Sequence, residues 1–380
     1  MISTLALAAV GVLAWIYLLA FRGRFWGSRE RDDVGEPPEP AAWPAVVAVV
    51  PARDEADVVG QAIRSLRLQD YPGEFRIILV DDNSSDGTAQ VALDAGGDHP
   101  VEVIAGAPLA AGWTGKLWAQ SQGVAHAVAH SPAYLLLTDA DISHDLRNLR
   151  RLVARAEAGG LVLTSLMARL TVRTGWERVL IPAFVFFFQM LFPFAWVNDP
   201  KRKTAAAAGG CILVRRETLE AAGGLAAIRG EIIDDCALAR LLKRRGPIWL
   251  GLTKRVQSLR PYSGLGDIGR MVARSAYAQL GYSPVLLAAT VVAMAVIFAA
   301  PPLLAMFAPA PARWLGLATW VAMGLALRPM LKLYRLWGLW GATLPLAGAL
   351  YGAFTLWSAV QSWRGRGGQW KGRAQDALAS

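Results

Sequence analysis

The most constraining feature of the sequence is a repeated alternation of apolar runs with helical patterns between residues 45 and 138. A helical pattern follows each of the first three runs, and the runs themselves cover residues 45–50, 76–80, 101–104 and 133–138. Apolar strands that alternate with helices form a mostly parallel sheet with helices on both faces. We therefore predict an α/β fold for the domain at residues 45–284.

Acidic residues follow three of these four predicted strands: Asp54 and Glu55, Asp81 and Asp82, and Asp139 and Asp141. In a parallel sheet, ligands bind beyond the carboxyl ends of the strands. Asp also caps helices and begins turns, so one such cluster alone has a structural explanation. Three clusters at equivalent strand ends favour a shared binding site.

The usual nucleotide-binding signatures are absent from the sequence. No G-x-G-x-x-G follows the first strand, and Leu117 stands where a Walker A loop needs Ser or Thr. Lys116 is the candidate cation near these strand ends. It either binds a phosphate of the donor or is simply the residue at which a helix starts. Asp139 and Asp141 would repel each other without a cation between them, and carboxylates with substrate phosphates suit a hard divalent ion. We predict Mg²⁺ or Mn²⁺ at these two residues, bridging a diphosphate.

Several segments are apolar enough to enter a membrane. Residues 2–21 carry no charge and reach the ~20 residues that a spanning helix needs. A cleaved signal peptide is the alternative, but no basic segment precedes the run and no clear cleavage site follows it, so we predict an anchor. Residues 285–331 suit two spans, and 337–357 form a further apolar stretch. The apolar segment 179–197 is cut by prolines, and we predict that it lies in the membrane interface, with a Phe-rich surface that receives a lipid.

The net charge of +10 and the mean hydropathy of +0.34 favour a membrane protein. Basic residues gather at 22–31, 328–335 and 364–373, a pattern typical of contact with anionic head groups on the cytoplasmic side. No nucleic-acid fold coincides with them.

Three full spans after the catalytic domain would place the basic tail outside. We therefore expect one segment, 337–357 with Pro345 near its middle, to be re-entrant or interfacial. The two cysteines indicate neither zinc nor a disulfide.

The motifs occur in the order PARDE, DDNSSDGT, GK, DAD, GGCILVRRETL and DDCAL. Together they resemble the family 2 inverting glycosyltransferases of the GT-A fold, over about residues 45–260. The stretches PAFVFFFQMLFPF, AAAAGGCILVRR and WKGR look most like the membrane-bound hopene-associated glycosyltransferases. The ceramide glucosyltransferase group is similar more distantly.

This resemblance implies roles for individual residues. Glu55 and Asp82 would hold the uracil and ribose of a nucleotide sugar, and the other donor-site positions would be Pro51, Arg53, Asp81, Lys116, Asp139, Gly209, Gly210 and Arg274. Asp139 and Asp141 match the metal-binding triplet. Asp235 matches the general base, with Asp234 where the family usually has Glu. Acidic residues at a helix start also stabilise its dipole, and the two glycines alternatively mark a turn.

One motif of the family is only partly present in this sequence. Arg274 fills the arginine of a Gln/Arg-x-x-Arg-Trp motif, but Met271 and Ser275 replace its first and last members. Arg274 serves either the donor diphosphate or lipid phosphates. The missing Trp argues against a processive polysaccharide synthase and favours a single transfer to a lipid.

The resemblance and the residues together predict an inverting glycosyltransferase in the bacterial inner membrane. It would move a sugar from a nucleotide donor, most simply a UDP-sugar, to a lipid, with hopanoid biosynthesis as the expected context. The predicted organisation is an anchor (1–22), a linker (23–44), the cytoplasmic GT-A domain (45–284), C-terminal membrane helices (285–363) and a basic tail (364–380). A membrane-associated nucleotidyl- or phosphotransferase and a non-catalytic scaffold are the alternatives.

Overall fold

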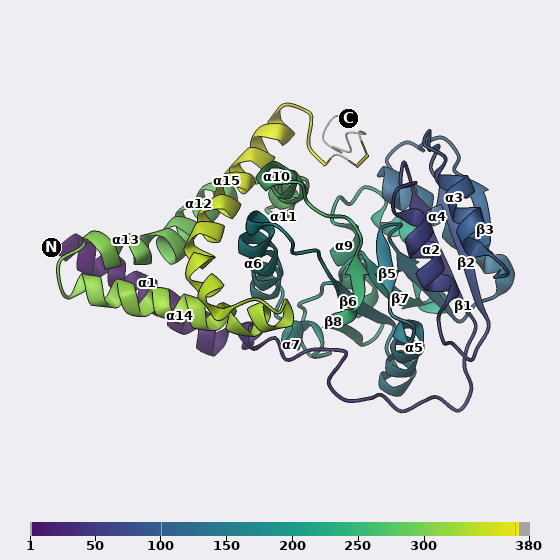
Figure 1. Ribbon diagram of the computed structural model, residues 1–380, viewed down its shortest axis with the longest axis horizontal. Helices are drawn as coiled ribbons and strands as arrows, with labels where there is room; N and C mark the ends of the chain where they lie inside the picture. Colours follow the sequence, from purple (N-terminus) through teal and green to yellow (C-terminus); the bar gives the residue numbers. More distant parts are fainter. Residues whose placement is uncertain (1, 100, 369, 372–380) are drawn as a thin grey trace.

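The structure, a computed structural model, describes residues 2–99, 101–368 and 370–371. Its centre is an eight-stranded sheet in the order β3-β2-β1-β4-β7-β6-β8-β5 (Figure 1). The strands are β1 (Val46–Ala52), β2 (Phe75–Asp81), β3 (Val101–Ala105), β4 (Tyr134–Thr138), β5 (Ile142–His144), β6 (Leu163–Arg169), β7 (Cys211–Arg215) and β8 (Ile248–Ser258). The pairs β3–β2, β2–β1 and β1–β4 are parallel. Strand β7 runs antiparallel to its neighbours β4 and β6, and β5 runs antiparallel to β8. The four predicted strands and the mixed α/β class are confirmed.

The two faces of the sheet are covered by different helices. Val46, Ala48 and Val50 of β1 share a core with α2 (Val59–Arg67), α3 (Thr88–Gly96) and α5 (Asn148–Gly159). Val47 and Val49 share the opposite core with α4 (Gly115–Ala127) and α9 (Asp234–Lys243). Since successive side chains of a strand point to opposite faces, a strand covered on both sides must be apolar throughout. This requirement produces the unbroken apolar runs in the sequence.

Shorter helices complete the domain and connect it to the apolar helices. They are α6 (Gly175–Leu191), α7 (Phe194–Val197), α8 (Arg216–Ala221), α10 (Leu265–Ala273) and α11 (Ala276–Gln279), with the 3-10 turns η1 (Phe25–Gly27), η2 (Val128–His130) and η3 (Leu225–Ile228).

Four helices are long and apolar enough to cross a membrane: Ser3–Phe21, Pro284–Phe307, Ala312–Leu333 and Gly338–Trp363. They correspond to α1 (Ile2–Phe21), the continuous α12, η4 and α13 (Pro284–Met294, Ala295–Ala299, Ala300–Phe307), α14 (Ala312–Leu333), and η5 with α15 (Gly338–Thr343, Leu344–Trp363). In Figure 1, α1, α13 and α14 lie side by side in an arm that points away from the sheet. Large apolar side chains on this arm are exposed, which suits lipid surroundings better than water.

Helix α6 contains most of the segment that we predicted to be interfacial. A capping box begins the helix, because Glu177 N–H donates to Thr174 Oγ1 and the Glu177 carboxylate accepts from Thr174 N–H. Phe186 and Phe187 are buried, and their rings pack against η1 and the C-terminal helices. The expectation that the phenylalanines of this segment form a surface for a lipid is therefore wrong for these two rings, because other helices already cover them.

The last apolar segment turns back beside α14. Trp320 Nε1 of α14 donates to Ala342 O at 2.9 Å, and Gly324 lies against Gly341. Helix α15 then begins beside Phe298 and reaches α11, where Tyr277 N–H donates to Ser358 Oγ. Pro345 lies in the first turn of α15, where its missing N–H leaves no helical hydrogen bond unmade.

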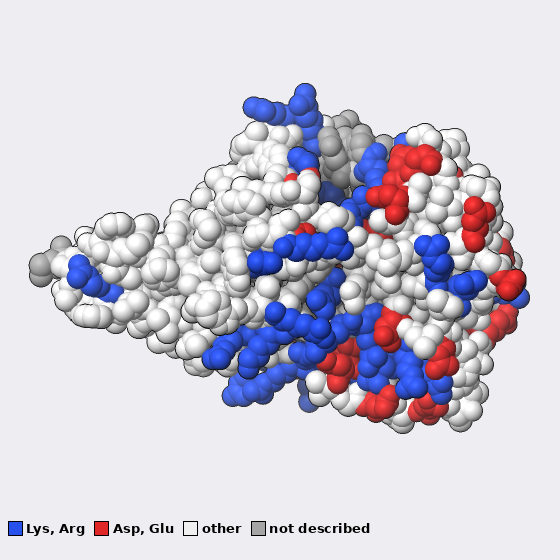
Figure 2. Space-filling view, in the orientation of Figure 1, with Lys and Arg blue, Asp and Glu red and all other residues white. Residues whose placement is uncertain are grey.

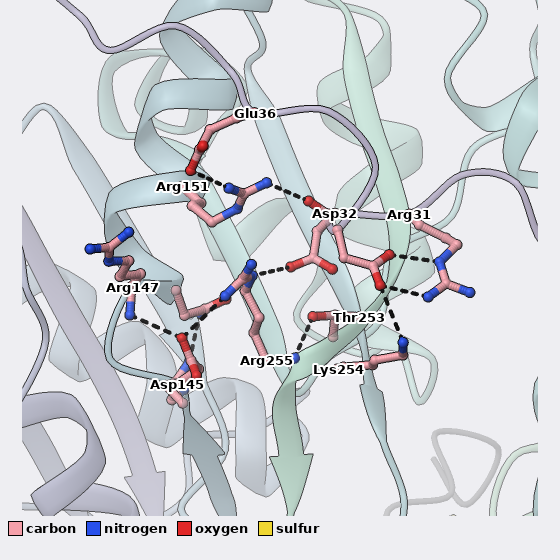
Figure 3. A network of polar contacts seen from close by, with 12 residues as sticks. Arg31, Asp32, Glu36, Asp145, Arg147, Arg151, Thr253, Lys254 and Arg255 are labelled. Atoms are coloured by element: carbon pink, nitrogen blue, oxygen red, sulfur yellow. Dashed lines mark hydrogen bonds and ion pairs between the residues drawn. The ribbon is translucent and has the colours of Figure 1, made fainter. Parts of the chain in front are cut away.

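Part of the predicted linker is docked on the domain (Figure 3). The main chain of Asp32 and Glu30 exchanges hydrogen bonds with Leu252 of β8. The Asp32 carboxylate is 3.4 Å from Arg255 Nε, and burial is the main cause of its raised pKa. Arg151 of α5 donates to Asp32 O at 2.8 Å. These contacts fix the chain between α1 and β1 against the sheet domain.

Candidate functional site

The acidic loops after β1, β2 and β4 meet at one edge of the sheet. Ala52 at the end of β1 pairs with Asp81 at the end of β2, and β4 lies parallel on the other side of β1. The common direction of the strands brings Glu55, Asp82 and Asp139 to the same edge. The structure therefore brings together the three acidic clusters that the sequence placed at equivalent strand ends.

Several predicted donor residues hold the loops themselves. Arg53 Nη1 donates to Asp82 O at 2.6 Å and lies 3.4 Å from Asp82 Oδ2. Asp54 N–H donates to Ser84 Oγ, and Asp54 Oδ1 accepts from Ser85 N–H at 2.9 Å. These contacts join the first loop to the second. Arg53 is thus positioned to orient Asp82.

Two other predicted donor residues also have structural partners. Pro51 is buried within β1, where its partner in β2 is Val80. Asp81 Oδ1 accepts hydrogen bonds from the backbone N–H and the hydroxyl of Ser84. Both residues shape the end of their strand, and contact with a ligand remains a prediction for them.

Glu55 is the most buried carboxylate of the first loop, with 8% of its surface exposed. Its backbone N–H donates to Thr88 Oγ1 at 2.8 Å, which orients the side chain along the sheet edge. One carboxylate oxygen pairs with Arg260 Nη2, and the other lies 2.7 Å from Lys371 Nζ. Burial raises the pKa of Glu55, and the two cations oppose that shift.

Arg260 also reaches the predicted metal triplet. Its Nε is 3.5 Å from Asp141 Oδ2, so one guanidinium joins Glu55 to Asp141. The backbone N–H of Leu259 donates to Asp141 O at 2.8 Å and fixes this approach. Burial and the neighbouring charge of Asp139 raise the pKa of Asp141. The site therefore has an excess of negative charge that Arg260 relieves only in part.

Lys116 connects the predicted metal triplet to the second acidic pair. It is the second residue of α4, and its Nζ lies 2.7 Å from Asp139 Oδ1 and 3.6 Å from Asp234 Oδ2. Burial opposes the ammonium charge, but the two carboxylates outweigh it and raise the pKa of Lys116. The positive charge of Arg274 lowers the pKa of Lys116, so Arg274 lies close enough to act on the same site. Lys116 is thus both a helix-start residue and a site cation.

Asp235 faces the interior at the start of α9. Its Oδ2 accepts from Gly209 N–H at 2.9 Å, and its Oδ1 accepts from Cys236 N–H at 2.7 Å. Burial, followed by the charge of Asp234, raises the pKa of Asp235 to about 6. A carboxylate with such a pKa is deprotonated at neutral pH and still basic enough to accept a proton.

The two predicted glycines have different surroundings. A Cβ on Gly209 would lie 3.3 Å from Lys116 Nζ and 3.5 Å from Asp235 Oδ2. Gly209 lines a pocket with Lys116, Asp234 and Asp235. A Cβ on Gly210 would instead meet Ile142 at 3.1 Å, within the packing of the sheet. The close approach at the site therefore depends on Gly209.

A separate cluster lies at the other end of α4. His126 Nε2 is 2.7 Å from one oxygen of Glu102, and His130 Nε2 is 3.1 Å from the other. At 1.5 Å of rise per residue, His126 lies about 15 Å along the helix from Lys116. This cluster does not belong to the acidic site.

Sequence reasoning missed two cations of the site, Arg260 and Lys371. Arg260 follows the end of β8 by two residues, and Lys371 belongs to the tail after α15. Arg260 carries no local pattern that distinguishes it from other arginines, whereas Lys371 lies in the WKGR stretch, which carried part of the resemblance but no assigned role. A weak signal is that the acidic strand ends required more positive charge than Lys116 alone supplies.

Residues 47–223 match the family model of glycosyl transferase family 2. The matched span contains the loops after β1, β2 and β4, together with Lys116 and Gly209. It ends before Asp234 and Arg260. The match supports a family 2 glycosyltransferase.

One of the similar solved structures shares the fold of this chain. The mannosyltransferase PcManGT of Pyrobaculum calidifontis, solved with GDP-Man and Mn²⁺, has a TM-score of 0.58 and 20% identity and covers 95% of this chain and 99% of its own. Glucosyl-3-phosphoglycerate synthase of Mycobacterium tuberculosis, solved with Mn²⁺, UDP-Glc and phosphoglyceric acid, has a TM-score of 0.39 and 22% identity over 63% of this chain and 80% of its own.

An N-acetylglucosaminyltransferase of Mesorhizobium japonicum is 28% identical over 92 residues. The aligned region is 24% of this chain and spans only 22% of the length of that relative. The chain is therefore similar to PcManGT in its fold, and to the N-acetylglucosaminyltransferase over a short region.

Proposed function

We propose that this family 2 domain transfers a sugar, with inversion, from a UDP-sugar to a lipid acceptor in the bacterial inner membrane. The observation that carries the proposal is the convergence of Glu55, Asp141, Lys116 and Asp235 at one sheet edge, next to helices apolar enough to span a membrane. A hopanoid context rests on the resemblance of the sequence stretches alone.

The nucleotide would bind along Glu55 and Asp82, with Lys116 facing its phosphates. The residues of the triplet fit a divalent cation, because Asp139 and Asp141 offer only oxygen ligands and burial with mutual repulsion raises the pKa of Asp141. When bound, Mg²⁺ or Mn²⁺ supplies charge that stabilises the departing diphosphate. The mannosyltransferase PcManGT, which shares the fold, was solved with Mn²⁺ and GDP-Man, and this supports the assignment.

Asp235 would act as the general base. Its carboxylate takes the proton of the acceptor hydroxyl as that oxygen forms a bond to the anomeric carbon. The bond between the anomeric carbon and the diphosphate oxygen breaks on the opposite face, and the nucleoside diphosphate leaves with the electron pair. Gly209 and Cys236 hold the base through their N–H groups, and Lys116 keeps Asp234 from adding unrelieved repulsion.

A lipid acceptor is supported by the connection of the site to the apolar helices. Thr171 Oγ1 donates to Arg260 O at 3.1 Å, and Glu177 of α6 accepts from Tyr262 N–H at 3.1 Å. Tyr351 of α15 in turn donates to Leu180 O of α6. The loop that bears Arg260 is therefore tied to the helical part of the protein.

The distribution of charge supports a membrane surface at this junction. Figure 2 shows Lys and Arg side chains in a band along the boundary between the apolar arm and the sheet domain. The loop after α7 adds the exposed Lys201, Arg202 and Lys203. Such a band attracts anionic head groups on the cytoplasmic side.

The direct test uses purified protein with labelled UDP-sugars and a bacterial lipid extract. The proposal expects UDP release together with one labelled glycolipid of a single added sugar. A ladder of longer products would indicate a processive synthase, and transfer of labelled phosphate would indicate a phosphotransferase. Comparing the lipids of a deletion strain by mass spectrometry tests the hopanoid context.

Cysteine labelling from each side of sealed vesicles tests the topology. The turn of η5 back along α14 supports a re-entrant last segment, and the contact of Lys371 with Glu55 supports a tail on the catalytic side. New cysteines at Lys201 and Lys371 should then react only from the cytoplasmic side. Cys211 and Cys236 are both buried, so the native background should be low. Labelling of either new site from outside would contradict the corresponding part of the topology.

A further inference from the structure

The chain after α15 returns to the nucleotide side of the site. Helix α15 ends at Trp363, and the described part of the tail extends from there toward the sheet domain (Figure 1). Lys371 Nζ lies 2.7 Å from Glu55 Oε1 and donates to Asp54 O at 2.9 Å. A residue near the C-terminus thus contacts the first acidic loop, far away in sequence.

This contact differs from an ordinary surface ion pair. The side chain of Glu55 is 11% exposed and that of Lys371 is 23% exposed, so solvent screens the pair less than an exposed one. Arg260 already pairs with the second oxygen of Glu55. One carboxylate therefore faces two cations, one on each of its oxygens.

The second cation beside Glu55 can also serve an anionic ligand. The lysine ammonium is a compact charge on a flexible stem, so it can keep contact with Glu55 or turn toward a bound phosphate without movement of the sheet. Arg260 has less freedom, because it also pairs with Asp141. Lys371 is thus the cation of this pair that is free to follow the ligand.

We propose that Lys371 is a donor-binding residue, and that the C-terminal tail delivers it to cover the nucleotide end of the donor site. The proposal rests on the proposed function, since it takes the ligand at Glu55 to be a nucleoside diphosphate. It assigns the tail a part in binding the donor, and it couples the last membrane-associated helix to the site.

The test measures nucleotide binding to the purified full-length protein by calorimetry, with UDP and GDP each in the presence of MnCl₂. Lys371→Met should raise the Kd of the bound nucleotide about tenfold, and Lys371→Arg, which keeps the charge, should remain close to the wild type. Lys203→Met is the matched control, because Lys203 is exposed in the loop after α7. Its Kd should be unchanged.

A second readout follows the tail itself. Trypsin cleaves after Lys371, and UDP or GDP should slow this cleavage in the wild type if the tail closes over the nucleotide. An unchanged Kd in Lys371→Met would overturn the inference while the proposed function stands. A lower Kd in that variant would also overturn it, because the tail would then compete with the donor. Failure of the wild type to bind either nucleotide would overturn the proposed function and this inference with it.

Discussion

Replacing Asp235 with Asn separates the structural role of this residue from its proposed catalytic role. Both carboxylate oxygens accept backbone N–H donors, from Gly209 and Cys236. An Asn side chain has one oxygen and one NH₂ group, so one of the two N–H groups loses its acceptor in either orientation. A buried donor without a partner costs about 1–3 kcal/mol in free energy of unfolding. We therefore expect a lower Tm but a folded protein.

The effect on rate should be much larger than the effect on stability. General-base catalysis contributes about 10²–10⁴ in rate, so kcat of Asp235→Asn should fall by that factor. Burial raises the pKa of Asp235 to about 6, and only the deprotonated carboxylate accepts a proton. The wild-type kcat should therefore be level above that pH and fall about tenfold for each pH unit below it.

The assay measures kcat and donor KM between pH 5 and 8, together with thermal unfolding. Asp234→Asn is the matched control variant. It removes one contact of Lys116 and should mainly raise donor KM. An Asp235→Asn variant whose kcat stays within tenfold of the wild type would refute the assignment. Loss of kcat in Asp234→Asn alone would assign the base to Asp234.

Three further predictions concern the rest of the site. Arg260→Gln removes the cation shared by Glu55 and Asp141 and should raise donor KM about tenfold, or about 1.4 kcal/mol; an unchanged KM at saturating metal would contradict this role. Gly209→Ala places a Cβ 3.3 Å from Lys116 Nζ and should lower kcat severalfold with an unchanged Tm, so a lower Tm at full activity would show a packing role instead. Asp141→Asn should raise the Mn²⁺ concentration for half-maximal activity at least tenfold, and EDTA should abolish wild-type activity; activity that persists in EDTA would exclude a metal requirement.

The sheet was predictable from the sequence where its strands are covered on both faces. β1, β2 and β4 are each followed by a charged loop, so both ends of the apolar run are visible in the sequence. β6 and β8 are harder to predict, because their pairing joins distant segments and includes a register shift between Met167 and Arg169. β5 has only three residues and owes its place to β8. Such strands are defined by their partners rather than by their own periodicity.

The candidate site likewise has a part that could be predicted from the sequence and a part that could not. The carboxylates follow from strand direction, since parallel strands deliver their ends to one edge. The cations do not follow from strand direction, because Arg260 comes after β8 and Lys371 comes after the last apolar helix. The position of each depends on the return of the chain through tertiary contacts. The burial of Phe187 by Phe298 and Tyr351 has the same cause, because an apolar run alone does not indicate which helices will cover it.

Lys116 gives the sharpest test of how the proposed metal site is balanced. Its ammonium lies 2.7 Å from Asp139 Oδ1, an oxygen of the triplet, so an incoming divalent cation must overcome the repulsion of this positive charge. Two unit charges 4 Å apart interact by about 4 kcal/mol at an effective dielectric of 20. Even a third of that value, about 1.4 kcal/mol, corresponds to tenfold in Kd.

Lys116→Met should therefore bind Mn²⁺ alone about tenfold more tightly than the wild type, measured from the EPR signal of free Mn²⁺. The same variant should bind UDP with Mn²⁺ more weakly, because the phosphates lose their ammonium partner. The opposite signs matter, since general damage to the site would weaken both. If Mn²⁺ alone bound the variant no more tightly than the wild type, Asp139 would not be a metal ligand. The role of its carboxylate would then be to pair with Lys116.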